Sequence, residues 1–292
     1  MKCKWIKKLT AGIIFLAAVG SLSGCQKAAT SENLFRDIEV NMTSVESAEE
    51  NQIVKLQMGD GDSAISQESN LDIEMIRDPA AVHRKGQQKT NMDGTKETQE
   101  MESYQVEEDG KTVIYSGTDE AWEKNAVEEK ETSSQQTVLF DGLQNLSGAF
   151  SVSQDLATVN KEECFELIGT ISGTQFQETF ADTLKALLGE DSSDLSGWNL
   201  QASEDEENNE ELQQKLNNIK VDCVIDIYRS NILPAKITFD LTDYLKAAGE
   251  ENAQVTSYTL EVTFVSYNDT KKIKVPKAVK ESAKDNGEDE AE

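Results

Sequence analysis

The chain has 292 residues, of which 28 are basic and 55 are acidic, and its formal net charge is −27. An acidic surface of this kind repels nucleic acid and anionic lipid headgroups, which argues against nucleic acid as a partner and against membrane binding through a basic patch. The length is enough for one large domain. Aromatic residues make up only 6% of the chain, so an ordered core must come mainly from patterned Val, Ile, Leu and Met.

The N-terminus has the pattern of a secretory signal. Four lysines within residues 2–8 precede an apolar run over residues 9–19, which is shorter than the ~20 residues that a membrane-spanning helix needs. The run is followed by the tetrapeptide LSGC at residues 22–25. This tetrapeptide resembles the lipobox of bacterial lipoproteins, in which the cysteine thiol takes a diacylglyceryl group and the chain is cut just before it. The alternative is an ordinary secretory signal that carries a cysteine by chance.

The lipobox resemblance implies that residues 1–24 are a lipoprotein signal peptide and that Cys25 is the lipidated residue. Residues 25–33 then form a short lipidated tether, because residues 26–33 are small and polar. Two acyl chains on one cysteine anchor a protein stably to a bilayer. We therefore expect an extracytoplasmic protein that is anchored to the cell membrane through the lipid on Cys25. Loss of the four signal lysines changes the formal net charge to about −31.

From residue 36 to about residue 125, apolar and polar residues alternate in several runs. Strict alternation is typical of strands with one buried and one wet face. The clearest runs cover residues 37–42, 53–59 and 70–76. Asp-Gly pairs at 93–94 and 109–110 are typical of hairpin turns between such runs. These signals predict an antiparallel meander of roughly seven strands, beginning at residue 37.

The middle of the chain changes to helical spacing over residues 136–189, with a strand predicted at 163–171. The strongest helix signal covers residues 174–188, followed by Gly189 where a C-terminal cap belongs. Its apolar face contains Phe176, Phe180, Leu184, Leu187 and Leu188. Residues 190–210 are acidic and polar, which predicts a solvated loop; within it, Ser203 and Glu206 match a capping box that could begin a short helix.

Alternation returns over residues 221–227, 235–241 and 258–264, and residues 281–292 form an acidic tail predicted to be disordered. The order is therefore strands, helices, then strands, and each strand is apolar on one face only. We predict an α+β fold in which a single curved antiparallel β-sheet, a half-open barrel, wraps its apolar face around a few helices. The predicted domain covers residues 34–280.

Five segments together resemble a known group of proteins: the lipobox, the Met-containing runs DIEVNM and NLDIEMIRDP, the strand pair DGKTVIYSGTDEAWEKN, and the C-terminal VSYNDTKKIKVPKAVKE. They are similar to an uncharacterised group of secreted bacterial lipoproteins, which in turn resembles the LolA/LppX-like superfamily. The resemblance covers most of residues 34–280. It implies a half-open barrel closed by helices around an apolar cavity. Relatives of that shape carry lipids, or the acyl chains of lipoproteins, across the envelope, and others sense misassembled envelope components.

The leading hypothesis for function is a non-enzymatic, lipid-anchored protein that binds a lipid or acyl chain in a cavity of the sheet. The alternative is an envelope sensor or protein-interaction module that has no ligand cavity and binds an envelope protein partner. Methionine in the strands fits both a core-filling role and an adaptable binding site. The predicted cavity face consists of Val54, Leu56, Met58, Leu71, Ile73, Met75, Ile237, Phe239, Leu260 and Val262.

The sequence gives little support for catalysis, a metal site or a cofactor. His83 is the single histidine, which excludes a His-rich metal site, and we expect it to be an exposed surface residue. No HExxH, CxxC or Walker motif is present. Trp122 is interpreted either as cover for the edge of the core or as a contact at the rim of a site. Cys164 and Cys223 are an even pair in an oxidising location, so they could form a disulfide; two buried free thiols are the alternative.

Overall fold

The computed structural model describes residues 29–59, 64–92, 94–118, 121–127, 143–188, 213–248 and 255–285, with the backbone alone for 127, 181–188, 248 and 285. The helices are α1 (Ser31–Met42), the 3₁₀ helix η2 (Leu143–Ala149), α3 (Gly173–Leu188), a short turn of helix over 213–218, α5 (Thr242–Ala248) and α6 (Lys277–Ser282). Among the helices in these ranges, none is both long and apolar enough to cross a membrane.

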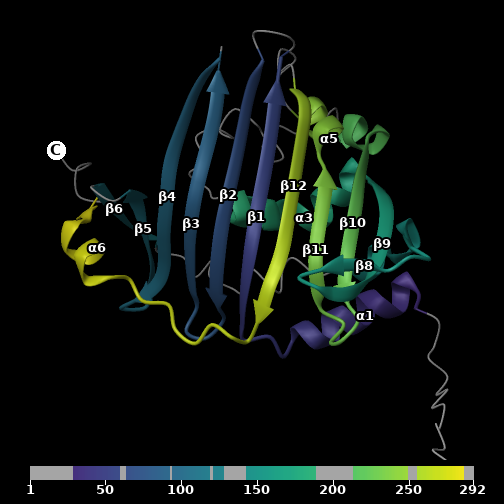
Figure 1. Ribbon diagram of the computed structural model, residues 1–292, viewed down its shortest axis with the longest axis horizontal. Coiled ribbons are helices and arrows are strands. Elements are labelled where there is room, and N and C mark those ends of the chain that lie inside the picture. The colour runs from purple at the N-terminus through teal and green to yellow at the C-terminus, as the bar shows by residue number, and fades with distance from the viewer. Residues whose placement is uncertain are drawn as a thin grey trace, which may run out of the picture.

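The strands form one large sheet, which Figure 1 shows face on. They are β1 (Ser47–Met58), β2 (Ile65–Ile76), β3 (Ala81–Met92), β4 (Thr95–Glu108), β5 (Lys111–Thr118), β6 (Ala121–Val127), β7 (Phe150–Val152), β8 (Ala157–Val159), β9 (Glu162–Ser172), β10 (Lys220–Tyr228), β11 (Pro234–Asp240), β12 (Val255–Tyr267) and β13 (Lys284–Asp285).

The strand order across the sheet is β13-β6-β5-β4-β3-β2-β1-β12-β11-β10-β9-β7, with β8 paired to β9. Among the described strands, every pairing is antiparallel except that of the short β13 with β6. In the described part of the chain, no pairing joins the two ends of this order, so the sheet is unclosed. The predicted fold class is confirmed: a curved antiparallel sheet with a few helices.

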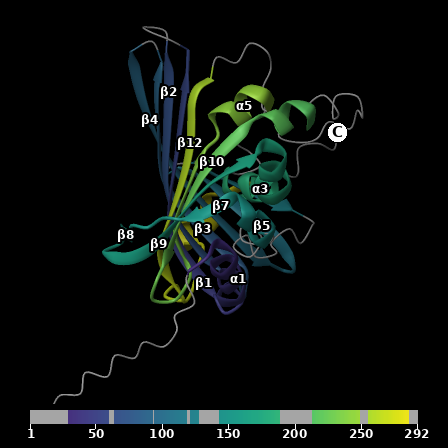
Figure 2. The ribbon, with the colours of Figure 1, turned by 90° about the vertical axis from the view of Figure 1, so that its right-hand side faces the viewer.

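The helices α1, α3 and α5 lie on the same side of the sheet, as Figure 2 shows, and we call this side the inner face. Phe35 and Ile38 of α1 and Phe176 of α3 belong to one hydrophobic core with inward side chains of β9 to β12. The ring of Phe239 on β11 lies 5.3 Å from that of Phe176 and 5.0 Å from that of Phe180. The alternation of apolar residues along the strands therefore supplies one face that the helices bury.

The prediction of a strand over residues 37–42 was wrong, because these residues belong to α1. Ile38 and Met42 alternate with polar neighbours, but they are also four residues apart, which is helical spacing. Both are buried, whereas Val40 between them is 61% exposed. The N-cap Thr30 accepts a hydrogen bond from the backbone N–H of Asn33. The meander accordingly has six strands, β1 to β6, instead of roughly seven.

The strong signals in the second half of the chain are confirmed. The predicted strand at 163–171 lies in β9, the predicted helix at 174–188 lies in α3, and the three later runs lie in β10, β11 and β12. Of the expected helical region, residues 136–142 lie outside the described residues. So do the acidic loop over 190–210 and its capping box at Ser203.

The C-terminal segment is ordered further than the sequence suggests. It runs from β12 to the far edge of the sheet, where α6 continues to Ser282 and β13 pairs with β6. Val275 and Val279 pack with Tyr104 and Trp122 on the side of the sheet opposite to α1 and α3, which we call the outer face. The first five residues of the expected tail, 281–285, are therefore part of the fold, and Trp122 packs in a core as one of its two interpretations predicted.

Cys164 and Cys223 do not form a disulfide; both are free, buried thiols. In the pairing of β9 with β10, Cys164 is opposite Tyr228 and Cys223 is opposite Gly169. The two cysteines are thus an odd number of positions apart along the register, which places their side chains on opposite faces of the sheet. Burial raises the pKa of the Cys223 thiol, which keeps it protonated and unreactive.

Candidate functional site

All ten residues predicted to line a cavity lie on the inner face, on the four adjacent strands β2, β1, β12 and β11. The register shows this directly, because side chains directly opposite each other in an antiparallel pair share a face. Val54 on β1 is opposite Leu260 on β12, which is in turn opposite Phe239 on β11. On the other side of β1, Leu71 of β2 is opposite Gln52.

The ten residues divide into a packed set and a partly covered set. Ile237, Phe239, Leu260 and Val262 are at most 2% exposed and belong to the core beneath α1 and α3. Ile73 and Met75 are buried in a smaller cluster with Val82. The remaining four, Val54, Leu56, Met58 and Leu71, are half-buried. We call these four residues the inner strip, and they are the part of the prediction that keeps apolar surface uncovered.

Buried polar side chains continue the inner strip toward the start of β1, and the alternation of apolar residues in the sequence does not mark them. Glu50 and Gln52 lie on the inner face in phase with Val54, and they are 3% and 1% exposed. Glu50 is opposite Ile73 of β2, which is opposite Arg84 of β3, so Glu50 and Arg84 share one row two strands apart. Strands β1 and β3, which carry these two residues, are about 10 Å apart. The sequence did contain one signal for Glu50 and Gln52. Both occupy even-numbered positions of β1, as do the inward-facing Val54, Leu56 and Met58, so the alternation places all five on one face.

The electrostatics of this polar row are dominated by burial. Burial raises the pKa of Glu50 from its ordinary value of 4.5 to about 7, and the positive charge of Arg84 opposes that rise. Burial also lowers the pKa of Arg84. The Oε1 atom of Glu50 is buried and has no hydrogen-bond partner. An ionised carboxylate with an unpaired oxygen in this position is destabilising unless another group approaches it.

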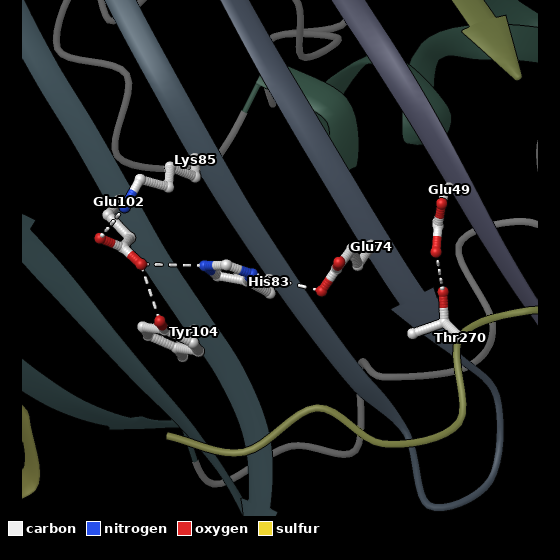
Figure 3. Close-up of polar contacts among 7 residues, drawn as sticks. All are labelled: Glu49, Glu74, His83, Lys85, Glu102, Tyr104 and Thr270. Carbon is white, nitrogen blue, oxygen red and sulfur yellow. Dashed lines mark hydrogen bonds and ion pairs between the residues drawn. The ribbon is translucent and has the colours of Figure 1, made fainter. Parts of the chain in front are cut away.

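A second polar cluster lies on the outer face and centres on His83, as Figure 3 shows. The imidazole Nε2 lies 3.0 Å from Oε1 of Glu102 on β4, and Nδ1 lies 3.4 Å from Oε2 of Glu74 on β2. The ring stacks on Tyr104 at 4.3 Å between centroids. His83 is half-buried, so the expectation of an exposed surface histidine was wrong. The reason is that both neighbouring strands place side chains against it.

Glu102 is the centre of the hydrogen bonding in this outer cluster. Tyr104 donates to it at 2.7 Å and Lys85 at 3.2 Å. Burial acts to raise the pKa of Glu102, but the hydrogen bonds from Tyr104, His83 and Lys85 hold it below the ordinary value. With a carboxylate at each ring nitrogen, His83 links β2, β3 and β4 to one another. Within the described ranges, no group of three or more His, Cys, Asp or Glu side chains could hold a metal ion.

The outer face also holds the C-terminal segment. Thr270 donates a hydrogen bond to Glu49 of β1 at 3.0 Å, at the right of Figure 3. Lys280 of α6 forms an ion pair with Glu108 of β4. Glu49 and Glu50 are neighbours in sequence but point to opposite faces, so β1 contributes to both surfaces. The inner strip with its polar row remains the arrangement best suited to an apolar ligand.

The raised pKa of Glu50 predicts an unusual dependence of stability on pH. The folded state binds this proton more tightly than the unfolded state, so the stability from Glu50 is fully present below pH ~4.5 and is lost as the pH rises through about 7. We therefore expect the Glu50→Gln variant to show a flatter profile than the wild type between pH 5 and 8 and to be the more stable protein at pH 8, in urea denaturation followed by circular dichroism.

The control is Glu68→Gln, which removes one carboxylate that is 44% exposed and paired with Lys55 on the adjacent strand. It should retain the decline of the wild type. Parallel pH profiles for the wild type and Glu50→Gln would contradict the assignment of this decline to Glu50.

Comparison with known proteins places this arrangement in a family. No curated protein matches the sequence. Among solved structures, the chain is similar to the lipoprotein LppX of Mycobacterium tuberculosis, with 13% identity, a TM-score of 0.44 and coverage of 84% of this chain and 98% of LppX. LprF of Mycobacterium bovis shows 11% identity, a TM-score of 0.45 and coverage of 84% and 96%.

A LolA superfamily protein of Nitrosomonas europaea shows 8% identity and a TM-score of 0.23, over 86% of this chain and 97% of that chain. The sequence also matches a family model. Residues 30–284 fit DUF6612, which is described as a family of unknown function. This range includes β1 to β12, the first residue of β13, the inner strip and the His83 cluster. The chain belongs to the DUF6612 family.

Proposed function

We propose that the mature protein is a non-enzymatic, lipid-anchored extracytoplasmic protein that binds an apolar ligand, a lipid or an acyl chain, against the inner face of its sheet. The observation that carries this proposal is the inner strip. Its four residues, which the sequence marks as inward-facing, share one face of β1 and β2 and stay half-buried next to a core whose other side chains are packed.

The physical basis for binding is the apolar surface that the inner strip leaves uncovered. Burial of a ligand CH₂ group contributes about 0.8 kcal/mol, so an acyl chain gains affinity with each group that it places against the strip. Met58 at the end of β1 suits chains of different shape, because its thioether side chain is flexible and polarizable. The neighbouring core, rigid through contacts such as Phe180 with Phe239, supports one side of the strip.

The proposed anchor follows from the signal and lipobox at residues 1–25. From Cys25 to the start of α1 at Ser31 the chain spans six residues, which reach at most about 20 Å when fully extended. The domain would therefore stay close to the membrane surface, within reach of lipids that enter or leave the bilayer.

The contacts of His83 support the non-enzymatic part of the proposal. Both of its ring nitrogens lie against carboxylates, which fits a structural role for this histidine.

The first test is native mass spectrometry with lipid extraction on a chain that begins at Gln26. We expect a stoichiometric lipid, and we expect a fluorescent fatty acid to bind the delipidated protein. A Leu56→Gln variant should weaken binding of the fluorescent fatty acid by about tenfold, because it places a polar group in the strip. The matched control is Ile53→Gln, since Ile53 is also half-buried on β1 but lies on the outer face.

An empty protein that binds no added fatty acid would overturn the ligand proposal. Equal losses in Leu56→Gln and Ile53→Gln would argue that the effect comes from the stability of β1 and not from a site on its inner face. In the first case the sensor or interaction module becomes the better hypothesis, and cross-linking to envelope proteins is the experiment that identifies its partner.

The anchor has its own test, a Cys25→Ala variant expressed from the full chain. Without the thiol there is no atom for the diacylglyceryl group, so we expect the variant to lose incorporation of a labelled fatty acid and to leave the membrane fraction. A Cys164→Ala variant is the control for removal of a cysteine elsewhere. Incorporation of label into Cys25→Ala at the wild-type level would refute the assignment of Cys25.

A further inference from the structure

On the basis of the ligand site proposed above, we propose that Glu50 receives the polar end of the ligand and that this end is a neutral headgroup carrying a hydroxyl donor. The inference starts from the unpaired Oε1 atom of Glu50. Glu50 is 3% exposed, and a buried acceptor without a partner destabilises the folded protein. Buried polar atoms in folded proteins almost always have partners, so an orphaned one on a candidate binding face indicates a missing group.

The position of Glu50 relative to the inner strip fits an amphiphile. Glu50 and Val54 share the inner face of β1 and are about 13 Å apart along the strand, and Met58 lies about 13 Å beyond Val54. A ligand whose polar end meets Glu50 can therefore lay its chain along Val54, Leu56 and Met58. Gln52 stands between the polar and apolar parts, opposite Leu71.

The charge of the row favours a neutral headgroup. Arg84 supplies the positive charge that acts on Glu50, so the row already combines one acid and one base. A second carboxylate from a free fatty acid would place two like charges in a site of low dielectric, which is unfavourable. A hydroxyl group donates a hydrogen bond to the carboxylate oxygen without adding a charge, and such charge-assisted bonds are stronger than neutral ones.

Asp226 provides a matched control within the same chain. It is 7% exposed and its Oδ1 atom has no hydrogen-bond partner. Unlike Glu50, Asp226 lies on the outer face of the sheet. On β10 it is opposite Glu166 of β9 and Lys236 of β11. Lys236 in turn forms an ion pair with Glu261 on that face. A buried orphan carboxylate alone therefore does not predict an effect on ligand preference, whereas one on the inner face does.

The experiment measures the affinity of the chain beginning at Gln26 for two probes with the same acyl chain, 1-monomyristoylglycerol and methyl myristate. Only the first carries hydroxyl donors. We expect the wild type to prefer monomyristoylglycerol by at least tenfold in displacement of a fluorescent fatty acid. The Glu50→Leu variant should reduce that preference to within twofold while its affinity for methyl myristate is retained. Asp226→Asn should keep the wild-type preference.

Glu50→Leu removes the negative charge that acts on Arg84, so a second variant guards against a folding defect. Glu50→Gln keeps an acceptor oxygen of similar shape but removes the negative charge, and we expect it to retain part of the preference, between the values of the wild type and Glu50→Leu. Circular dichroism of each variant establishes that the fold is intact. If Glu50→Leu does not fold, a Glu50→Gln preference equal to that of the wild type overturns the proposal.

The outcomes separate this inference from the proposed function. If neither probe binds the wild type, the apolar ligand site itself is refuted, and the role of Glu50 with it. If both probes bind the wild type equally, or if a folded Glu50→Leu variant keeps the preference, the headgroup assignment is overturned while lipid binding stands. Free myristic acid is a third probe, and tighter binding of it than of monomyristoylglycerol would contradict the neutral headgroup.

Discussion

The pairing of β1 with β12 is the contact on which the rest of the sheet depends. Its register runs from Ala48 opposite Tyr267 to Met58 opposite Val255, and it joins segments about 200 residues apart in sequence. Through it, the meander β1 to β6 and the strands β9 to β12 become one surface. Val54 and Leu260 share a face only because this pairing forms, so the helix-covered core and the inner strip are two regions of a single inner face.

The two faces of this sheet use polar residues differently. On the outer face, the carboxylates of Glu74 and Glu102 engage both ring nitrogens of His83 and thereby connect three strands. On the inner face, Glu50 lies opposite Ile73 of β2 and Phe264 of β12 and keeps an unpaired oxygen. A fold that needed only stability would have an apolar residue at such a position, since replacement of buried charges by packed apolar groups is often neutral or stabilising. We propose the headgroup site described above as the reason for a buried carboxylate at this position.

The sequence was sufficient for the fold class and for the direction of the inner residues, because both depend on local periodicity. Alternation correctly predicted the inward side of β1, β2, β11 and β12, and the spacing of Phe176 and Phe180 correctly predicted α3. Periodicity failed at α1, where Ile38 and Met42 fit both a strand and a helix. Periodicity also could not reveal Glu50, because a search for alternating apolar residues passes over a polar residue that shares their phase. It could not show that the two cysteines face opposite sides of the sheet, because that depends on the register between β9 and β10.

The central claim is that an apolar ligand lies on the inner strip, and photo-cross-linking with a diazirine-bearing fatty acid tests it most directly. Mass spectrometry of the labelled peptides identifies the residues that contact the chain. The account predicts labels on Val54, Leu56, Met58 or Leu71 and competition by unlabelled lipid. Labels confined to exposed outer-face residues such as Ile168 and Val265, or labelling that unlabelled lipid does not reduce, would contradict it.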